Sequence, residues 1–160
     1  MSAEESRSRI AGTLLPEADT KARALLPLLL DAGYAPEAEH DDYVCVRDPD
    51  SGFALFLTDF GGHRLELRCY FKLRRELDHE TRESYARQCS EKLWAKYLID
   101  ADGDLVVSHV VCCAGGLHQP NLMRTVRSFL GLCVYTLREC DPDGVVSRGD
   151  DDAADAHDGE

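Results

Sequence analysis

The chain has 160 residues, of which 44% are apolar, so it has enough hydrophobic material for a globular protein and does not have a disordered composition. No apolar run approaches the ~20 residues of a membrane span, and the N-terminal MSAEESRSRI lacks the apolar region of a secretory signal, so we expect a cytoplasmic protein outside the membrane. The formal net charge of −12 argues against nucleic acid and anionic membranes as partners, because both are themselves polyanions.

Charge and cysteine content indicate how the chain is organised. Residues 141–160 contain eight acidic residues and one arginine, so they carry −7 of the total charge and are predicted to be a disordered acidic tail. Residues 1–17 are predicted to be a flexible N-terminal arm, which leaves residues 18–140 as a single domain. The seven cysteines are odd in number and no export signal is present, so we expect reduced thiols that pack as small apolar side chains.

The first half of the domain is predicted to be a helix followed by three strands. Residues 18–34 have a helical pattern, in which Pro27 should either kink the helix or mark the first turn of a shorter one. Turn sequences separate apolar stretches at 43–47, 53–59 and 64–71, and the last of these, RLELRCYF, alternates apolar and polar residues. Strands joined by such short turns form an antiparallel meander.

The second half is predicted to contain a helix, a hairpin and a final helix. Residues 78–97 should form the first helix, with Asp78 as its N-cap. An Asp-Gly turn between the apolar stretches 97–100 and 105–112 indicates a β-hairpin, and residues 119–140 carry the broad apolar arc of a buried helix. The order α-β-β-β-α-β-β-α predicts the class α+β, with helices packed on a mainly antiparallel sheet.

The turn of this hairpin contains residue types that also occur in calcium sites. Asp100, Asp102 and Asp104 match the first, third and fifth positions of an EF-hand loop. Leu105, however, stands where that loop needs a glycine, and Val111 stands where it needs a bidentate glutamate. A hairpin with acidic residues at its tip accounts for the same residues, so no calcium site is predicted.

The histidines and cysteines in and after the second hairpin strand are residue types that also occur in zinc sites and in thiol enzymes. His109, Cys112, Cys113 and His118 lie close in sequence, but they lack the C-x2-C pairs of structural zinc sites. A thiol-dependent enzyme, with Cys112 or Cys113 as nucleophile and His109 or His118 as base, stays open as the alternative function. No catalytic, metal-binding or cofactor-binding residue is assigned.

Residues 93–130, LWAKYLIDADGDLVVSHVVCCAGGLHQPNLMRTVRSFL, resemble the YbjN family, in which an acidic turn, an apolar strand and a Gly-Gly-Leu sequence precede a long C-terminal helix. The resemblance implies the fold of type III secretion chaperones, which are small, acidic bacterial proteins, usually dimers, that wrap unfolded segments of secreted clients. YbjN proteins themselves are described as sensory transduction regulators, and neither group supplies catalytic residues. The cysteine pair and the acidic tail depart from the pattern. The matching residues are Asp100, Asp102, Gly103, Asp104, Leu105, Gly115, Gly116 and Leu117.

Two of the predicted strands are apolar on both faces, which indicates a protein partner. One face of strands 53–59 and 105–112 should meet the helices, and the other needs cover from a second subunit, a client or the rest of the chain. We therefore expect a non-enzymatic protein-binding module, chaperone-like or regulatory, that forms a homodimer and binds a protein client or regulatory partner without cofactor or metal. The candidate contact residues are Phe56, Tyr70, Val106 and Val110.

Overall fold

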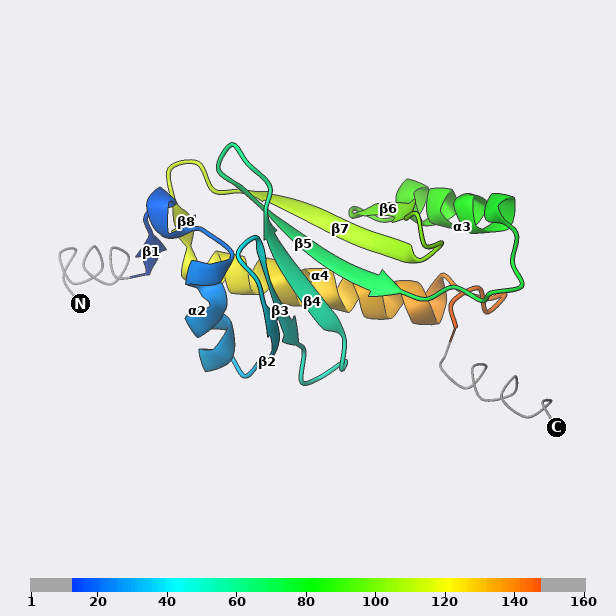
Figure 1. The fold of residues 1–160 in the computed structure, drawn as a ribbon, viewed down its shortest axis with the longest axis horizontal. Helices are drawn as coiled ribbons and strands as arrows, with labels where there is room; N and C mark the ends of the chain where they lie inside the picture. Colours follow the sequence, from blue (N-terminus) through cyan, green and yellow to red (C-terminus); the bar gives the residue numbers. More distant parts are fainter. Residues whose placement is uncertain (1–12, 148–160) are drawn as a thin grey trace. The chain divides into compact units, whose positions relative to one another are not determined.

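The computed structural model describes residues 13–147, which Figure 1 draws in colour. These residues divide into two compact units. Unit 1 comprises residues 13–69 and 108–131, and unit 2 comprises residues 70–107 and 132–147. The elements in chain order are β1 (Leu14–Leu15), the 3-10 helices η1 (Glu17–Asp19) and η2 (Arg23–Leu25), α2 (Leu26–Asp31), β2 (Ala35–Glu39), β3 (Tyr43–Arg47), β4 (Ala54–Asp59), β5 (Arg64–Phe71), α3 (His79–Lys92), β6 (Lys96–Ile99), β7 (Leu105–Cys112), β8 (Leu117–His118) and α4 (Gln119–Glu139).

Among the described residues, six strands form one mostly antiparallel sheet in the order β2-β3-β4-β5-β7-β6, and β1 pairs with β8 in a separate two-stranded sheet. This arrangement confirms the predicted α+β class, the meander and the hairpin. Residues 18–140, predicted as one domain, are divided between the two units, and the chain passes from one unit to the other within β5, β7 and α4.

The alternating pattern of the meander sorts its side chains onto two faces in unit 1. Val44 pairs with Leu57, and Leu57 pairs with Leu67, so apolar side chains line up across three strands. Burying each such side chain contributes roughly 1.5–3 kcal/mol relative to leaving it in water, so this inner face is the core of the unit. The buried side chains of unit 1 include Leu25, Leu29, Val44, Val46, Leu55, Leu57, Leu65, Leu67, Cys69, Val126 and Phe129.

The strand β2 was not predicted. Its sequence, APEAE, contains none of the β-branched or aromatic residues that favour strands, and all five residues are exposed. It forms because its backbone pairs with β3, from Ala35 opposite Arg47 to Glu39 opposite Val44, with an irregular register between Pro36 and Ala38. Proline is tolerated there because β2 is the edge strand of the sheet.

The first predicted helix is shorter than its sequence pattern. The helix α2 begins at Leu26 with Pro27 in its first turn, after the separate 3-10 helix η2. Proline lacks an N–H, which costs nothing in the first turn of a helix, where that group has no partner within the helix. Pro27 therefore marks the start of a shorter helix, which is one of the two expected outcomes.

At both ends, the described structure extends past the predicted boundaries of the domain. Leu14 pairs with His118 and Leu15 with Leu117, so residues 13–17 of the predicted arm take part in unit 1. In unit 2, Val146 is buried and pairs with Leu73. Residues 141–147 of the predicted tail therefore take part in unit 2, because two consecutive valines supply apolar surface within the acidic sequence. Residues 1–12 and 148–160 of the predicted arm and tail lie outside the described residues.

Unit 2 contains α3, β6, the first residues of β7 and the last part of α4. Asp78 caps α3 as predicted, since its carboxylate accepts a hydrogen bond of 2.8 Å from the Thr81 N–H. The hydroxyls of Tyr97 and Thr136 form a buried hydrogen bond of 2.7 Å. Within residues 13–147, no helix combines the length and apolar character that crossing a membrane requires.

Candidate protein-binding surface

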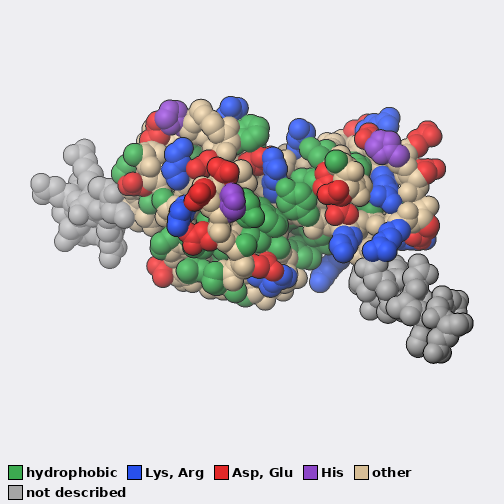
Figure 2. All heavy atoms as spheres, in the orientation of Figure 1, with side chains coloured by type: hydrophobic (Ala, Val, Ile, Leu, Met, Phe, Trp, Pro, Cys, Tyr) green, Lys and Arg blue, Asp and Glu red, His purple; other side chains and the backbone are tan. Residues whose placement is uncertain are grey.

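The sheet of unit 1 has an outer face that is less covered than its inner face. On β3 and β4, Tyr43 and Phe56 alternate with fully buried residues and are themselves only half-buried. On β7, Val110 is 39% exposed, while Val111 beside it is half-buried. Tyr43 and Phe56 lie on the same side of the β3–β4 pair, because Tyr43 is opposite Thr58, two residues from Phe56. We use the name open face for the three accessible side chains Tyr43, Phe56 and Val110 of unit 1. Figure 2 shows that hydrophobic side chains on the visible surface lie among acidic and basic ones.

Three side-chain rings contact one another in a row at the β3 side of the open face. The His40 ring stacks on Tyr43 with a centroid distance of 5.2 Å, and the Tyr43 ring meets Phe56 at 5.9 Å in a tilted geometry. Such contacts hold the rings in place before any partner arrives, which lowers the entropy cost of binding. Aromatic residues are also enriched among the side chains that dominate binding energy.

Charged groups border the same face. Arg47 forms an ion pair with Glu37, and Glu37 also accepts a hydrogen bond of 3.6 Å from the Cys45 thiol. Burial, with the nearby Glu37 carboxylate, raises the pKa of Cys45 to about 11, so this thiol stays protonated at neutral pH. An apolar centre with a polar border is the usual anatomy of a protein interface.

The two edges of the sheet are poorly suited to pairing with another strand. At the β2 edge, Pro36 cannot donate a hydrogen bond, and Glu37 and Glu39 add charge. At the β6 edge, the Ser90 hydroxyl contacts both the N–H and the C=O of Tyr97, at 3.3 and 3.2 Å. A partner therefore meets fewer free backbone groups at the edges than a bare strand would offer, which favours binding through a face.

The four predicted contact residues lie in different surroundings. Phe56 and Val110 belong to the open face of unit 1, whereas Tyr70 is 41% exposed in unit 2. Val106, also in unit 2, is only 4% exposed, so it offers little surface to a partner, and its role as a contact residue stays a prediction. The reason is that β7 is an interior strand whose first four residues are buried on both faces.

The hairpin tip uses its acidic residues for the turn. Asp100 Oδ1 accepts hydrogen bonds from the N–H groups of Asp102 and Asp104, at 3.0 and 2.9 Å. Gly103 has a positive φ of 85°, and the Arg82 guanidinium, which donates to its carbonyl at 2.9 Å, occupies the space of a side chain. Among residues 13–147, no three His, Cys, Asp or Glu side chains are grouped so that they could hold a metal ion.

The two adjacent cysteines differ in accessibility. Cys112 is exposed, whereas Cys113 is 1% exposed and its pKa is raised, mainly by burial. A nucleophilic thiol needs a lowered pKa, so the surroundings of Cys113 do not support that role. Burial lowers the pKa of His109, which keeps this imidazole neutral at neutral pH.

Sequence reasoning did not identify Tyr43 or Glu17. Tyr43 stands at the first position of a predicted strand, where alternation over so few residues gives no clear face. Glu17 was placed in the flexible arm, yet its carboxylate meets His63 Nδ1 at 2.7 Å and accepts a hydrogen bond of 2.7 Å from the Gly115 N–H. Neither contact could be inferred from local sequence, because each joins residues far apart in the chain.

The class that this architecture defines is an α+β fold in which helices accompany a mostly antiparallel meander and hairpin. No family model matches the chain, and no curated protein matches its sequence. Solved structures nevertheless show which fold it is.

The chain has a YbjN-like fold. It matches the crystal structure of YbjN from E. coli, described as a candidate transcription regulator, with a TM-score of 0.62 and 15% sequence identity over 78% of this chain and 94% of YbjN. An uncharacterised protein from Methanothermobacter thermautotrophicus matches with a TM-score of 0.54 and 11% identity over 76% of this chain and 97% of that one. At such identities the likeness concerns the fold alone.

Proposed function

We propose that this chain is a cytoplasmic, non-enzymatic protein-binding module with a chaperone-like or regulatory role, and that it acts as a homodimer. The observation that carries the proposal is the open face of unit 1, where aromatic and aliphatic side chains remain accessible opposite a fully buried inner face. Exposed apolar side chains that cluster on one surface are typical of interaction sites.

Two further observations support a protein partner. Pro36 at the β2 edge and the Ser90 contact with Tyr97 at the β6 edge leave fewer free backbone groups there, which favours a partner that binds a face. The description of E. coli YbjN as a candidate transcription regulator is consistent with a regulatory role, since a regulator without its own chemistry acts through what it binds. A chaperone-like role would use the same surface to hold an unfolded client.

The test is a charge placed on the open face. Val110→Asp puts a carboxylate where a partner would bury apolar surface, which costs several kcal/mol of binding energy unless the charge is paired. Leu30→Asp on α2 is the matched control, since Leu30 is also 39% exposed in unit 1 but does not belong to the open face. We expect light scattering to show a dimer for the unchanged chain and for Leu30→Asp, and a monomer for Val110→Asp.

Circular dichroism should show that both variants are folded, because each substitution is at an exposed position. Affinity purification followed by mass spectrometry would then identify bound clients, and Val110→Asp should lose them. A folded Val110→Asp that keeps the dimer and every client would contradict the proposal for this face.

A further inference from the structure

The first half of α4 carries a hollow on its exposed side that does not belong to the open face. The hollow has a volume of about 490 Å³. All of its lining comes from α4 within unit 1, because residues three and four positions apart share one side of a helix. The lining residues are Pro120, Met123, Arg124, Arg127 and Ser128.

Two arginines give this hollow a positive charge. Arg124 and Arg127 are both exposed, and within residues 13–147 neither forms an ion pair with a carboxylate. The exposed Arg23, by contrast, pairs with Glu39 at 2.6 Å. Since the hollow has no acidic residue in its lining, its two guanidinium groups are available to an anion.

A buried tyrosine holds one of these arginines in place. The guanidinium of Arg127 donates a hydrogen bond to the hydroxyl of Tyr34, which is only 5% exposed. A guanidinium has five N–H donors, so most of them stay available to an anion. Asp48 and Asp50 also influence the pKa of Tyr34, but neither lines the hollow. A side chain that is already fixed loses less conformational freedom when it binds.

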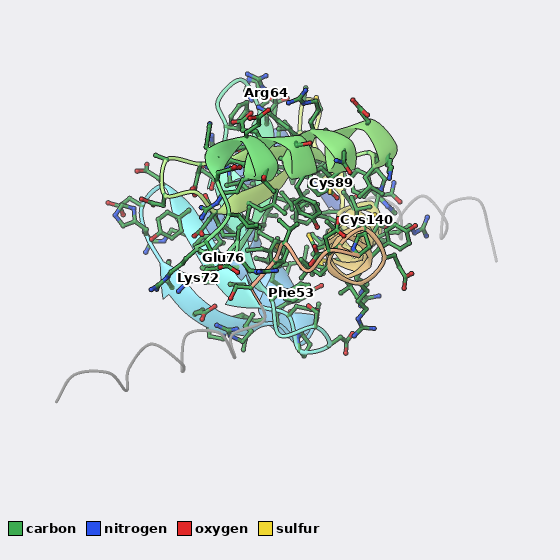
Figure 3. All side chains as sticks on the ribbon, turned by 90° about the vertical axis from the view of Figure 1, so that its right-hand side faces the viewer. Phe53, Arg64, Lys72, Glu76, Cys89 and Cys140 are labelled. Atoms are coloured by element: carbon green, nitrogen blue, oxygen red, sulfur yellow. The ribbon has the colours of Figure 1, made fainter. Side chains whose placement is uncertain are left out.

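The chain itself contains a segment of complementary charge. Residues 148–160, which lie outside the described residues, contain six carboxylate side chains and one arginine. Three of these carboxylates are consecutive, at residues 150–152. The segment follows Ser147, whose N–H donates a hydrogen bond of 2.9 Å to the carbonyl of Lys72 (Figure 3 labels Lys72). Guanidinium groups pair with carboxylates through two parallel hydrogen bonds, so this segment fits the hollow chemically.

The length of the segment permits a contact with α4. An extended chain gains at most about 3.5 Å per residue, so residues 148–160 can span about 45 Å. The whole of α4, with 21 residues, is about 30 Å long. The tether also gives the segment an effective concentration in the mM range, which a separate acidic peptide would have to match.

We propose that the acidic residues 150–152 of this chain bind in the hollow of α4, where Arg124 and Arg127 pair with their carboxylates. The Ser128 hydroxyl is a further donor to the same carboxylates. The bound segment excludes other anions from the two arginines. This inference goes beyond the proposed function, because it needs no partner and concerns a surface other than the open face.

The first test is zero-length crosslinking of the full chain. Arg124→Lys keeps the positive charge and supplies an amine, which a carbodiimide joins to a carboxylate only when the two groups are in contact. Arg87→Lys is the matched control, since Arg87 is exposed on α3, has no ion pair within the described chain and does not line the hollow. Peptide mass spectrometry should find residues 150–152 joined to the amine at position 124 at least about fivefold more often than to the amine at position 87. Coupling in about 0.5 M NaCl should abolish the difference, because salt screens exposed ion pairs.

The second test leaves the arginines unchanged and follows their side-chain Nε–H resonances by NMR. A proximal triple variant should shift the resonances of Arg124 and Arg127, because it removes the carboxylates that pair with them, and should leave that of Arg87 in place. A distal triple variant removes the same charge later in the segment, and should shift the two resonances less than about half as much. The proximal substitutions are Asp150→Asn, Asp151→Asn and Asp152→Asn, and the distal ones are Asp155→Asn, Asp158→Asn and Glu160→Gln.

An equal mixture of ¹⁴N- and ¹⁵N-labelled Arg124→Lys chains shows which copy supplies the segment. Crosslinks within one chain join peptides of the same label, which is the expected result. Mixed labels in about half of the crosslinked pairs would overturn the assignment to the same chain. Equal crosslinking at positions 124 and 87, or arginine resonances that stay in place in the proximal triple variant, would overturn the inference altogether, whether or not Val110→Asp loses its partner.

Discussion

The exposure and the pKa of each cysteine decide how fast its thiol can react. Cys112 is exposed at the end of β7, whereas Cys113 is buried and its pKa is raised. The thiolate is the reactive form, and the buried residue has both less of it and less access to reagents.

We therefore expect iodoacetamide to modify Cys112 at least about tenfold faster than Cys113 in the folded chain. Peptide mass spectrometry over a time course measures both rates, and labelling in urea serves as the control in which they should become similar. Faster labelling of Cys113 would show that its surroundings activate the thiol, and would revive the thiol enzyme as the function of this chain.

At the scale of elements, the β1–β8 pair depends on one glycine. Gly116 has a positive φ of 98°, and a Cβ atom there would lie 2.5 Å from the backbone oxygen of Leu15. Its neighbour Gly115 also has a positive φ, of 78°, but a Cβ atom there would meet nothing within 4 Å. Both positions thus require a positive φ, but only at Gly116 does the β1 backbone occupy the space of a side chain.

Alanine at each position separates these effects. Gly115→Ala should cost roughly 1–2 kcal/mol of unfolding free energy, the usual penalty of a left-handed conformation for an L-residue. Gly116→Ala should cost about 1–3 kcal/mol more, because the methyl group must displace the chain at Leu15. Urea denaturation of both variants measures the difference, and equal losses would mean that the β1–β8 contact is dispensable.

The elements that sequence predicts well are those whose side chains alternate. RLELRCYF forms β5 over the predicted residues, since a strand with one buried face shows its period directly. β2 was missed because its pairing with β3, rather than its composition, makes it a strand. Val146 was assigned to the tail because acidic neighbours dominate its local composition, although its own side chain is buried.

The candidate surface was predictable only in part, and the reason lies at the scale of the whole molecule. Doubly apolar strands indicated that some face needs cover, and Phe56 and Val110 are indeed accessible. Which half of β7 is covered depends on its neighbours in the sheet, and so Val106 is buried although its sequence surroundings resemble those of Val110. The ring contact between Tyr43 and Phe56 likewise exists only after β3 and β4 pair.

The whole molecule should unfold in one step, although it consists of two compact units. Because β5, β7 and α4 each supply residues to both units, melting either unit removes part of the elements that build the other. The single tryptophan of the chain, Trp94, belongs to unit 2, whereas the far-ultraviolet dichroism reports helices and strands of both units.

We expect the fluorescence of Trp94 and the dichroism to give coincident thermal transitions, which is the usual criterion for two-state unfolding. The measurement needs only the unmodified chain, with a second protein concentration to separate the effect of the proposed dimerisation. A fluorescence transition at clearly lower temperature would show that unit 2 unfolds on its own.

The proline and serine at the two edges of the sheet have a consequence for aggregation at high protein concentration. A chain that leaves an apolar face accessible can meet copies of itself often, and unprotected edges would let such encounters grow strand by strand into fibrils. Pro36 at one edge and Ser90 at the other interrupt that growth at its first step. We therefore expect that the open face can stay accessible without the chain acting as a template for amyloid.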